Sequence, residues 1–318
     1  MTARTAPAVL RYPWRALPWP VCVMALFLLP YVTDLYSLQV GYQVLQYAAL
    51  ASAWNLLAGY GGLTSLGTAA FVGIGAYSVA YLGNATGLPL LVLLPAAGLL
   101  AAVFAVAVSP AMFRLRGLYF TIGTLALAEA LRLLMVNLSV FGGAKGIVLQ
   151  ARTPPTYALY WLALAVAVVA TLAVMGVIAS PLSLSLRAVR DDEDVAREMG
   201  VITFRTKLWA FALAAFLMGL VGGVQAMNLG AVEPYGAFGL SWTVDTVAVA
   251  IIGGLSTRMG PWIGALFIVI LGQLLRDYPE GHVAITGVIL LVVIRFARRG
   301  LWGSAAAVVR ARRGGAGR

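Results

Sequence analysis

Two oppositely charged residues stand inside a long apolar run of the sequence. Glu129 and Arg132 lie within residues 117–137, a stretch long enough to cross a lipid bilayer as a helix. A charged side chain at the bilayer centre costs about 2.5–3.5 kcal/mol on insertion scales, so both residues must face protein or water. Their i, i+3 spacing puts them on one helix face, where they can neutralise each other. The pair is therefore either a structural ion pair that locks helices together or a polar element of a substrate pathway.

The rest of the sequence offers little for catalysis. It has one cysteine, Cys22, and one histidine, His282, which excludes an intrachain disulfide and a histidine cluster for a metal. Residues 142–146 contain three glycines around Lys145. They lack the spacing and the following Ser or Thr of a phosphate-binding loop. We therefore expect a protein that is not an enzyme and binds no cofactor or metal. If ATP drives it, a partner must hydrolyse the ATP.

The composition is that of a membrane protein with several spans. Of the 318 residues, 62% are hydrophobic and 10% are charged, whereas about a quarter of a soluble domain is charged. The apolar runs predict an all-α fold of about ten transmembrane helices, with eight as the alternative because three of the last runs are only about 15 residues long. The runs cover residues 19–37, 40–58, 62–83, 88–109, 117–137, 157–178, 207–228, 242–256, 260–275 and 282–296.

The basic residues predict the orientation of these spans. They gather at both termini and in the connections 110–116 and 179–206, and Lys and Arg collect on the cytoplasmic side of membrane proteins. We expect both termini in the cytoplasm and assign the net charge of +11 to this topology, with no nucleic acid partner. The chain divides into a basic N-terminal segment (1–18), a transmembrane domain (19–303) and a basic C-terminal tail (304–318).

The connection 179–206 is long and highly charged. Residues 185–199 contain no Gly or Pro, and Gly200 is a plausible helix stop. Glu193 and Arg197 have the i, i+4 spacing of a stabilising pair. The predicted helix has an apolar arc made by Ala188, Val189, Val195, Ala196 and Met199. Four consecutive acidic residues, 191–194, disfavour an anionic membrane surface, so docking on another protein is favoured over an interfacial helix.

Several uncharged residues within the apolar runs have two interpretations. Gly67, Gly73 and Gly75 in the third run either allow close helix packing, which we favour, or line a translocation path. Polar residues in the second and seventh runs are expected to hydrogen-bond between helices, and these are Gln46, Asn55, Gln225 and Asn228. Asp245, near the end of the eighth run, is expected to reach interfacial water.

Motifs along nearly the whole chain resemble one family, the high-affinity branched-chain amino acid permeases, which are membrane subunits of ATP-binding cassette importers. The motifs are Gly59–Gly67, Phe71–Tyr77, Arg116–Phe120, Leu127–Glu129, Gly142–Gly146, Leu186–Glu193, Met199–Gly200, Ile252–Thr257 and Gly260–Pro261. Each alone is common in membrane proteins, and their order and spacing carry the resemblance. The Ser65–Leu66–Gly67 motif resembles the M type of the two permease subunits.

The resemblance implies partners and a mechanism. A second, H-type permease would complete a heterodimeric channel in the bacterial inner membrane, two ATPase subunits would bind ATP and Mg²⁺ beneath it, and a periplasmic protein would deliver the amino acid for transport by alternating access. The residues implied to contact the ATPase are Arg187, Arg190, Asp191, Asp192, Val195, Ala196, Met199 and Gly200.

Two alternatives stay open. Ala144 and Lys145 stand where the family usually has an aspartate, so urea, short amides or other amino acids are possible substrates of the same importer class. The other alternative is a secondary transporter that runs on an ion gradient and uses Glu129 as its coupling site. The amphipathic segment argues against this alternative, because a carrier that works alone needs no docking element.

Overall fold

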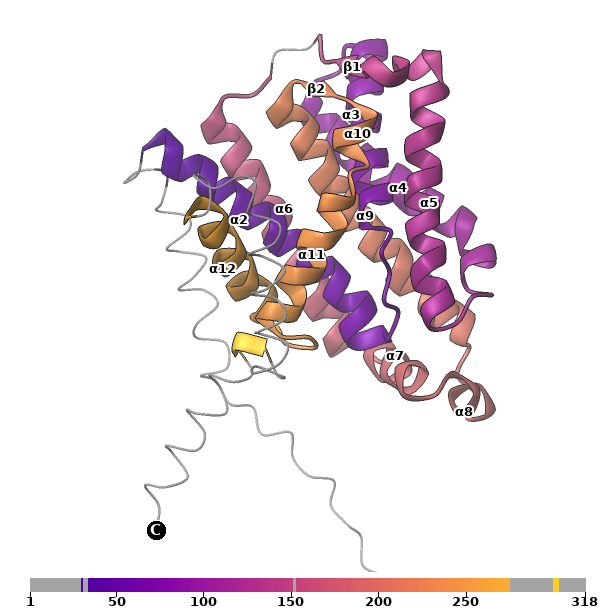
Figure 1. Ribbon diagram of the computed structural model, residues 1–318. Coiled ribbons are helices and arrows are strands. Elements are labelled where there is room, and N and C mark those ends of the chain that lie inside the picture. The colour runs from indigo at the N-terminus through magenta and orange to yellow at the C-terminus, as the bar shows by residue number, and fades with distance from the viewer. Residues whose placement is uncertain (1–29, 31–33, 151–152, 275–299, 303–318) are drawn as a thin grey trace, which may run out of the picture.

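The computed structural model describes residues 30, 34–150, 153–274 and 300–302 (Figure 1). This part of the chain is a helical bundle with one two-stranded antiparallel ribbon. The helices that form the bundle are α2 (Leu35–Asn55), α3 (Thr68–Thr86), α4 (Leu90–Met112), α5 (Leu118–Asn137), α6 (Thr156–Ala179), α9 (Thr203–Leu229), α11 (Leu240–Gly253) and α12 (Gly260–Leu274). Shorter elements are the π-helical turn η2 (Leu56–Tyr60), the 3₁₀ turns η3 (Ser139–Phe141) and η4 (Gly143–Lys145), α7 (Leu182–Asp191), α8 (Glu193–Glu198) and α10 (Pro234–Ala237). The expected termini 1–18 and 304–318 lie outside the described residues.

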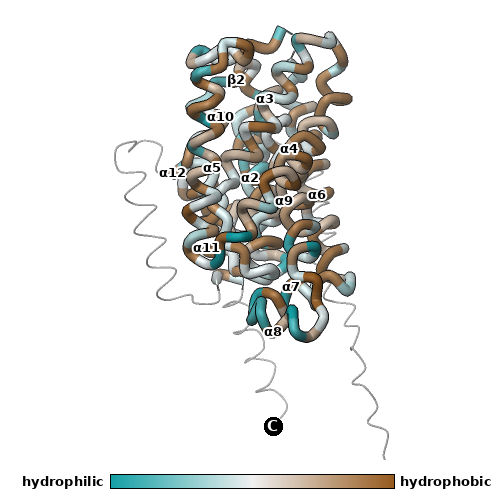
Figure 2. The backbone as a smooth tube through the Cα atoms, turned by 90° about the vertical axis from the view of Figure 1, so that its right-hand side faces the viewer, coloured by the Kyte–Doolittle hydropathy of each residue, from teal (hydrophilic) through white to brown (hydrophobic). Residues whose placement is uncertain are grey.

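The bundle has two different ends. At one end, β1 (Ile147–Val148) pairs with β2 (Ala231–Val232), with Ile147 opposite Val232. At the opposite end lie α7 and α8 (Figure 1). Figure 2 shows hydrophobic residues along the bundle helices and hydrophilic residues concentrated on the α7–α8 end. The hydropathy pattern therefore separates a membrane-embedded body from a charged end.

Helix α9 forms the centre of the bundle and contacts α2, α3, α4 and α6. Glycines bring α3 and α9 into backbone contact, because a Cβ atom on Gly75 would overlap the carbonyl of Gly219, and one on Gly222 would overlap the carbonyl of Val72. Gly73 is covered by the ring of Phe238, and Gly67 lies against Thr124 of α5. The prediction that glycines of the third run allow close helix packing is confirmed for Gly75.

Five of the described segments are long and apolar enough to cross a membrane, and with α12 as a shorter apolar helix they make this a multi-pass membrane protein. The five are Leu90–Met112, Leu118–Asn137, Thr156–Ala179, Thr203–Leu229 and Pro234–Gly253. The expected all-α class is confirmed. The count of ten spans stays a prediction, because 282–296 and most of 19–37 lie outside the described residues.

One predicted boundary is wrong. The third run was expected to be helical from residue 62, whereas α3 begins at Thr68. Residues 62–67 instead form a loop that is held by other elements: the indole of Trp54 donates to the carbonyl of Ser65 (2.7 Å), and the amide of Leu66 donates to the hydroxyl of Thr124 (2.9 Å). Gly62 has a φ of +69°, which a right-handed helix does not allow.

Candidate functional site: the α7–α8 segment and the polar residues of the bundle

The charged segment folds as two helices rather than one. The backbone of Asp192 is extended (φ −159°, ψ 116°), and its carboxylate accepts hydrogen bonds from the amides of Asp194 (2.9 Å) and Val195 (3.0 Å). Asp192 is thus the N-cap of α8, a role in which aspartate is strongly favoured. The prediction of a continuous helix over 185–199 is wrong, because the capping hydrogen bonds of Asp192 outweigh helix continuation. Asp192 followed by two acidic residues is the local signal for this start.

Gly200 ends the segment as predicted. Its φ is +87°, a conformation that glycine adopts without the Cβ penalty of other residues. The amide of Gly200 donates to the carbonyl of Arg197 (3.0 Å), and the amide of Val201 donates to the carbonyl of Ala196 (3.0 Å). These two bonds form a Schellman motif, which closes α8.

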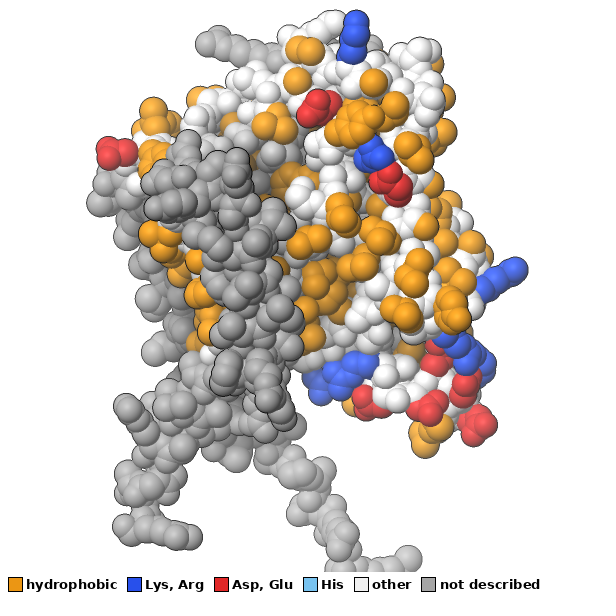
Figure 3. Space-filling view, in the orientation of Figure 1, with side chains coloured by type: hydrophobic (Ala, Val, Ile, Leu, Met, Phe, Trp, Pro, Cys, Tyr) orange, Lys and Arg blue, Asp and Glu red, His pale blue; other side chains and the backbone are white. Residues whose placement is uncertain are grey.

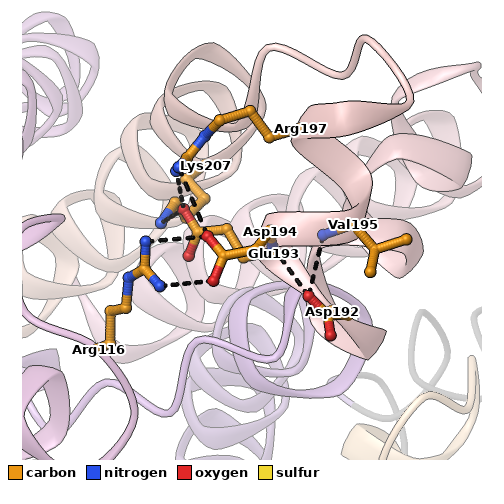
Figure 4. Close-up of polar contacts among 7 residues, drawn as sticks. All are labelled: Arg116, Asp192, Glu193, Asp194, Val195, Arg197 and Lys207. Atoms are coloured by element: carbon orange, nitrogen blue, oxygen red, sulfur yellow. Dashed lines mark hydrogen bonds and ion pairs between the residues drawn. The ribbon is translucent and has the colours of Figure 1, made fainter.

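Ion pairs fix α8 to the bundle (Figure 4). The ammonium of Lys207 at the start of α9 lies 2.6 Å from a carboxylate oxygen of Glu193, and the Lys207 side chain is 4% exposed. The guanidinium of Arg116, in the loop before α5, donates two hydrogen bonds to Asp194 (2.9 and 3.1 Å). This contact lowers the pKa of the Asp194 carboxyl below its usual value. The predicted pair of Glu193 and Arg197 is present at 3.5 Å.

The apolar residues of the segment separate into two sets. Val189 and Ala196 are buried against the bundle, whereas Val195 is 45% exposed and Met199 is 79% exposed. The expected single apolar arc is therefore wrong, since the break at Asp192 rotates α8 relative to α7. One set anchors the segment, and the other set is exposed at its surface. Charged side chains of both signs gather around this end of the molecule (Figure 3).

The two arginines of α7 turn toward the membrane helices. The guanidinium carbon of Arg187 lies 5.9 Å from the ring centre of Tyr60, within the range of a cation–π contact. Arg190 donates a hydrogen bond to the carbonyl of Gly59 (2.8 Å). Sequence spacing gave no sign of either long-range contact. The exposed side chains of this segment thus include Asp191, Asp192, Val195 and Met199, while Ala196 faces inward.

Glu129 and Arg132 form the expected ion pair on α5. The Nε atom of Arg132 donates to Glu129 (2.9 Å), and an Nη atom makes a second, short contact with the same carboxylate. The guanidinium also lies 4.8 Å from the ring centre of Tyr235 on α10. The Glu129 side chain is 53% exposed. Gly67, Gly73 and Gly75 are buried in helix contacts and do not share this exposed surface.

A second polar group joins α2, α9 and α11. The amide of Gln46 donates to the hydroxyl of Tyr42 (2.7 Å) and to Gln225 (2.9 Å), which confirms the expected hydrogen bonding between helices for Gln46 and Gln225. Asp245 accepts a hydrogen bond from the hydroxyl of Tyr47 (2.8 Å), and its expected contact with interfacial water stays a prediction.

These residues line a cavity of about 600 Å³ between α2, α9, α11 and α12. Tyr47, Gln225 and Trp242 also line a neighbouring cavity of about 490 Å³, which extends to Lys145 and Glu233 at the β1–β2 end. The residue pattern of α2 contains a signal for this lining that the predictions above do not use. The signal was the i, i+4, i+7 spacing of Gln39, Gln43 and Gln46, which places three amides on one face of α2.

Comparisons with known proteins give relatives over most of the chain. The LivM permease proteins of the high-affinity branched-chain amino acid transport systems of Salmonella typhimurium and Escherichia coli are each 27% identical over 304 residues, which covers 86% of this chain and 71% of theirs. The xylose transport permease XylH of Haemophilus influenzae is 31% identical over 113 residues, covering 35% of this chain and 29% of its own length. No solved structure matches the chain.

A protein-family profile agrees with the longer matches. It covers residues 36–294, which include every described bundle helix except the first residue of α2. The motifs, the helical fold and this profile lead to one assignment: the chain belongs to the family of permease components of branched-chain amino acid transport systems.

Proposed function

We propose that the chain is the M-type permease subunit of an ATP-driven importer of branched-chain amino acids, in the bacterial inner membrane with the α7–α8 end and both termini in the cytoplasm. One observation carries the ATP-driven part of the proposal. An exposed methionine, Met199, directly follows a short helix whose own position is fixed by Lys207 and Arg116. An apolar anchor on a rigid support is what a docking site for another protein requires.

The partner at this end is a pair of ATPase subunits that bind ATP and Mg²⁺. Closure of the ATPase pair would displace α8, and the contacts of Lys207 and Arg116 would carry that displacement to α9 and to the loop before α5. The bundle would then tilt as a rigid body between outward-facing and inward-facing states. Rigid tilting agrees with the glycine contacts between α3 and α9, since helices in backbone contact move together.

A second, H-type permease would cover α5. Of the apolar stretch of α5 that is long enough to cross the membrane, only 22% is buried within this chain. The buried share of the corresponding stretch of α9 is 78%. At a rise of 1.5 Å per residue, Glu129 lies about 12 Å along α5 from Asn137, the last residue of the helix. Its half-exposed carboxylate therefore falls within the hydrocarbon region of the bilayer. Because lipid does not stabilise a charged pair there, the face needs protein or water against it. A path between the two permeases supplies both, and the pair would offer both signs of charge to a zwitterionic substrate.

A branched-chain amino acid, delivered by a periplasmic binding protein, is the substrate that the comparisons favour. The two LivM relatives match 86% of the chain, whereas the xylose permease matches 35%. Urea, short amides and other amino acids are the substrates of the alternative, because Lys145 lies at the β1–β2 end where the substrate would enter.

The test is uptake by proteoliposomes that contain the chain with an H-type permease, ATPase subunits and a periplasmic binding protein of the proposed importer. Labelled leucine, urea and ribose are compared with ATP inside the vesicles. We expect leucine uptake that excess isoleucine and valine inhibit and that ribose does not. Uptake of urea or ribose without uptake of leucine would contradict the proposed substrate.

A further inference from the structure

The α2–η2 helix ends next to the turn that joins α11 to α12. The last carbonyl groups of a helix have no donors within the helix and carry the negative end of its dipole. The carbonyl of Gly59 is satisfied from outside its helix. It accepts one hydrogen bond from the hydroxyl of Ser256 (2.6 Å) and one from the guanidinium of Arg190 (2.8 Å).

Asn55, one turn earlier, holds the same α11–α12 turn. Its side-chain oxygen accepts from the amide of Ser256 (2.8 Å), and its side-chain nitrogen donates to the carbonyl of Thr257 (3.0 Å). The Asn55 side chain is almost fully buried. Ser256 has a φ of +57°, the one positive value among non-glycine residues of the described chain. Such a conformation persists only where its surroundings fix it, and here Asn55 and Gly59 do so.

Arg190 completes the contact from α7. The same Nη1 atom that donates to Gly59 lies 3.4 Å from the hydroxyl of Ser256. The aliphatic stem of Arg190 lies over Gly62, where a Cβ atom would come within 2.5 Å of its Cγ. A positive charge at a helix C-terminus is favourable. The Arg190 side chain thus contacts the end of the α2–η2 helix, the loop residue Gly62 that follows it, and the turn between α11 and α12.

We infer that Arg190 is a positioning residue that transmits movement of α7 to α2 and to the α11–α12 turn together, through Gly59 and Ser256. Because both acceptors lie within reach of one guanidinium nitrogen, a displacement of α7 pulls on both elements at once. The inference assigns Arg190 a contact within this chain rather than the ATPase contact that the family resemblance implies. It rests on the proposed function, since the movement of α7 originates in the ATPases.

The test compares variants in the complete assembly of permeases, ATPases and binding protein in proteoliposomes, with leucine uptake and ATP hydrolysis measured in the same vesicles. The readout is the number of leucine molecules taken up per ATP hydrolysed, together with copurification of the ATPases. Arg190→Ala should keep the ATPases bound and hydrolysing while uptake per ATP falls about tenfold or more. Arg190→Lys should lose about threefold, because an ammonium has no planar fork to replace the guanidinium.

Ser256→Ala provides a second test that leaves the charge of α7 intact. Ser256 is distant from Met199 in sequence and contacts only the junction, so its variant should bind the ATPases normally and lose about threefold in uptake per ATP. The double variant Arg190→Ala with Ser256→Ala should lose little more than Arg190→Ala alone, since the two side chains act on one carbonyl. Arg205→Ala is the matched control, an exposed arginine without a side-chain partner among the described residues, and should equal the wild type.

The outcomes distinguish a failure of the positioning role of Arg190 from a failure of the proposed importer function. Unchanged uptake per ATP in both Arg190→Ala and Ser256→Ala would overturn the positioning role while the wild type still supports the importer. Loss of ATPase copurification in Arg190→Ala, with Ser256→Ala unaffected, would also overturn it and would return Arg190 to the docking surface. A wild-type assembly that takes up no leucine with ATP would remove the proposed function, and the inference with it.

Discussion

The ammonium of Lys207 lies 2.6 Å from the carboxylate of Glu193, so a buried charge at the start of α9 holds the first turn of α8. Removing one partner of a buried pair leaves the other charge unpaired, which typically costs about 3–5 kcal/mol. Glu193→Gln should therefore lower the melting temperature of the purified protein by several degrees. The double variant Glu193→Gln with Lys207→Met should melt at a higher temperature than Glu193→Gln alone. Equal melting of wild type and Glu193→Gln would show that the pair does not anchor α8.

Gly75 permits the backbone contact between α3 and α9. A methyl group there would overlap the carbonyl of Gly219, so Gly75→Ala should separate the two helices and sharply reduce the yield of folded protein. Gly176 in α6 is the matched control, because a Cβ atom there meets nothing within 4 Å. Gly176→Ala should be neutral or stabilising by up to about 1 kcal/mol. Equal yields of the two alanine variants, measured by fluorescence-detected gel filtration, would refute the packing role.

Met199 is 79% exposed, so its side chain buries little surface within the single chain. Burying a methionine side chain contributes about 1.5–3 kcal/mol, so Met199→Ala should weaken ATPase binding about tenfold or more, and Met199→Asp should abolish uptake. Gly200→Trp should also abolish uptake, because tryptophan does not suit a φ of +87°. All three variants should remain in the membrane. Normal uptake by stably inserted Met199→Asp would refute the docking assignment.

Substitutions of Glu129 and Arg132 test whether this ion pair is structural or contacts the substrate. Either single substitution, Glu129→Gln or Arg132→Gln, leaves an unpaired charge within the membrane and should lower both yield and uptake. The double substitution should restore the yield, since no charge is left unpaired. If the pair lines the path, as we propose, leucine uptake stays low in the double variant. Recovery of uptake together with yield would make the pair structural.

The contact between Arg116 and Asp194 predicts how stability depends on pH. The Arg116 hydrogen bonds lower the pKa of Asp194, so the ion pair stabilises the folded state above the unfolded carboxyl pKa of about 3.9. Its contribution is lost as the pH falls through the lower, folded pKa. Both side chains are exposed, so the effect is small. The melting difference between wild type and Asp194→Asn should be constant at neutral pH and vanish in acid; a difference that grows on acidification would contradict this.

Local spacing predicted those contacts that lie within one helix. The pairs of Glu129 with Arg132 and Glu193 with Arg197 follow from i, i+3 and i, i+4 geometry, and Gly200 follows from the preference for glycine after a helix. The break at Asp192 does not follow from the absence of Gly and Pro in residues 185–199, because a side-chain cap can start a new helix within such a run.

Long-range contacts could not be predicted in this way. Arg190 and Gly59 are separated by 131 residues, and Arg190 and Ser256 by 66. Arg190 contacts both residues because η2 and the α11–α12 turn lie at the same level of the bundle. A single sequence does not specify this arrangement. The cavity beside Asp245 could not be predicted for the same reason, because it forms only when α2, α9 and α11 are packed together.

The most direct test of the proposed function is the energy source for leucine uptake. Proteoliposomes are prepared with this chain alone and with its permease, ATPase and binding-protein partners, and each is energised separately by ATP or by a proton gradient. The proposal predicts uptake only in the complete assembly, only with ATP, and only when the binding protein is present outside. Uptake by the chain alone under a proton gradient would contradict it and would make Glu129 the coupling site of a secondary transporter.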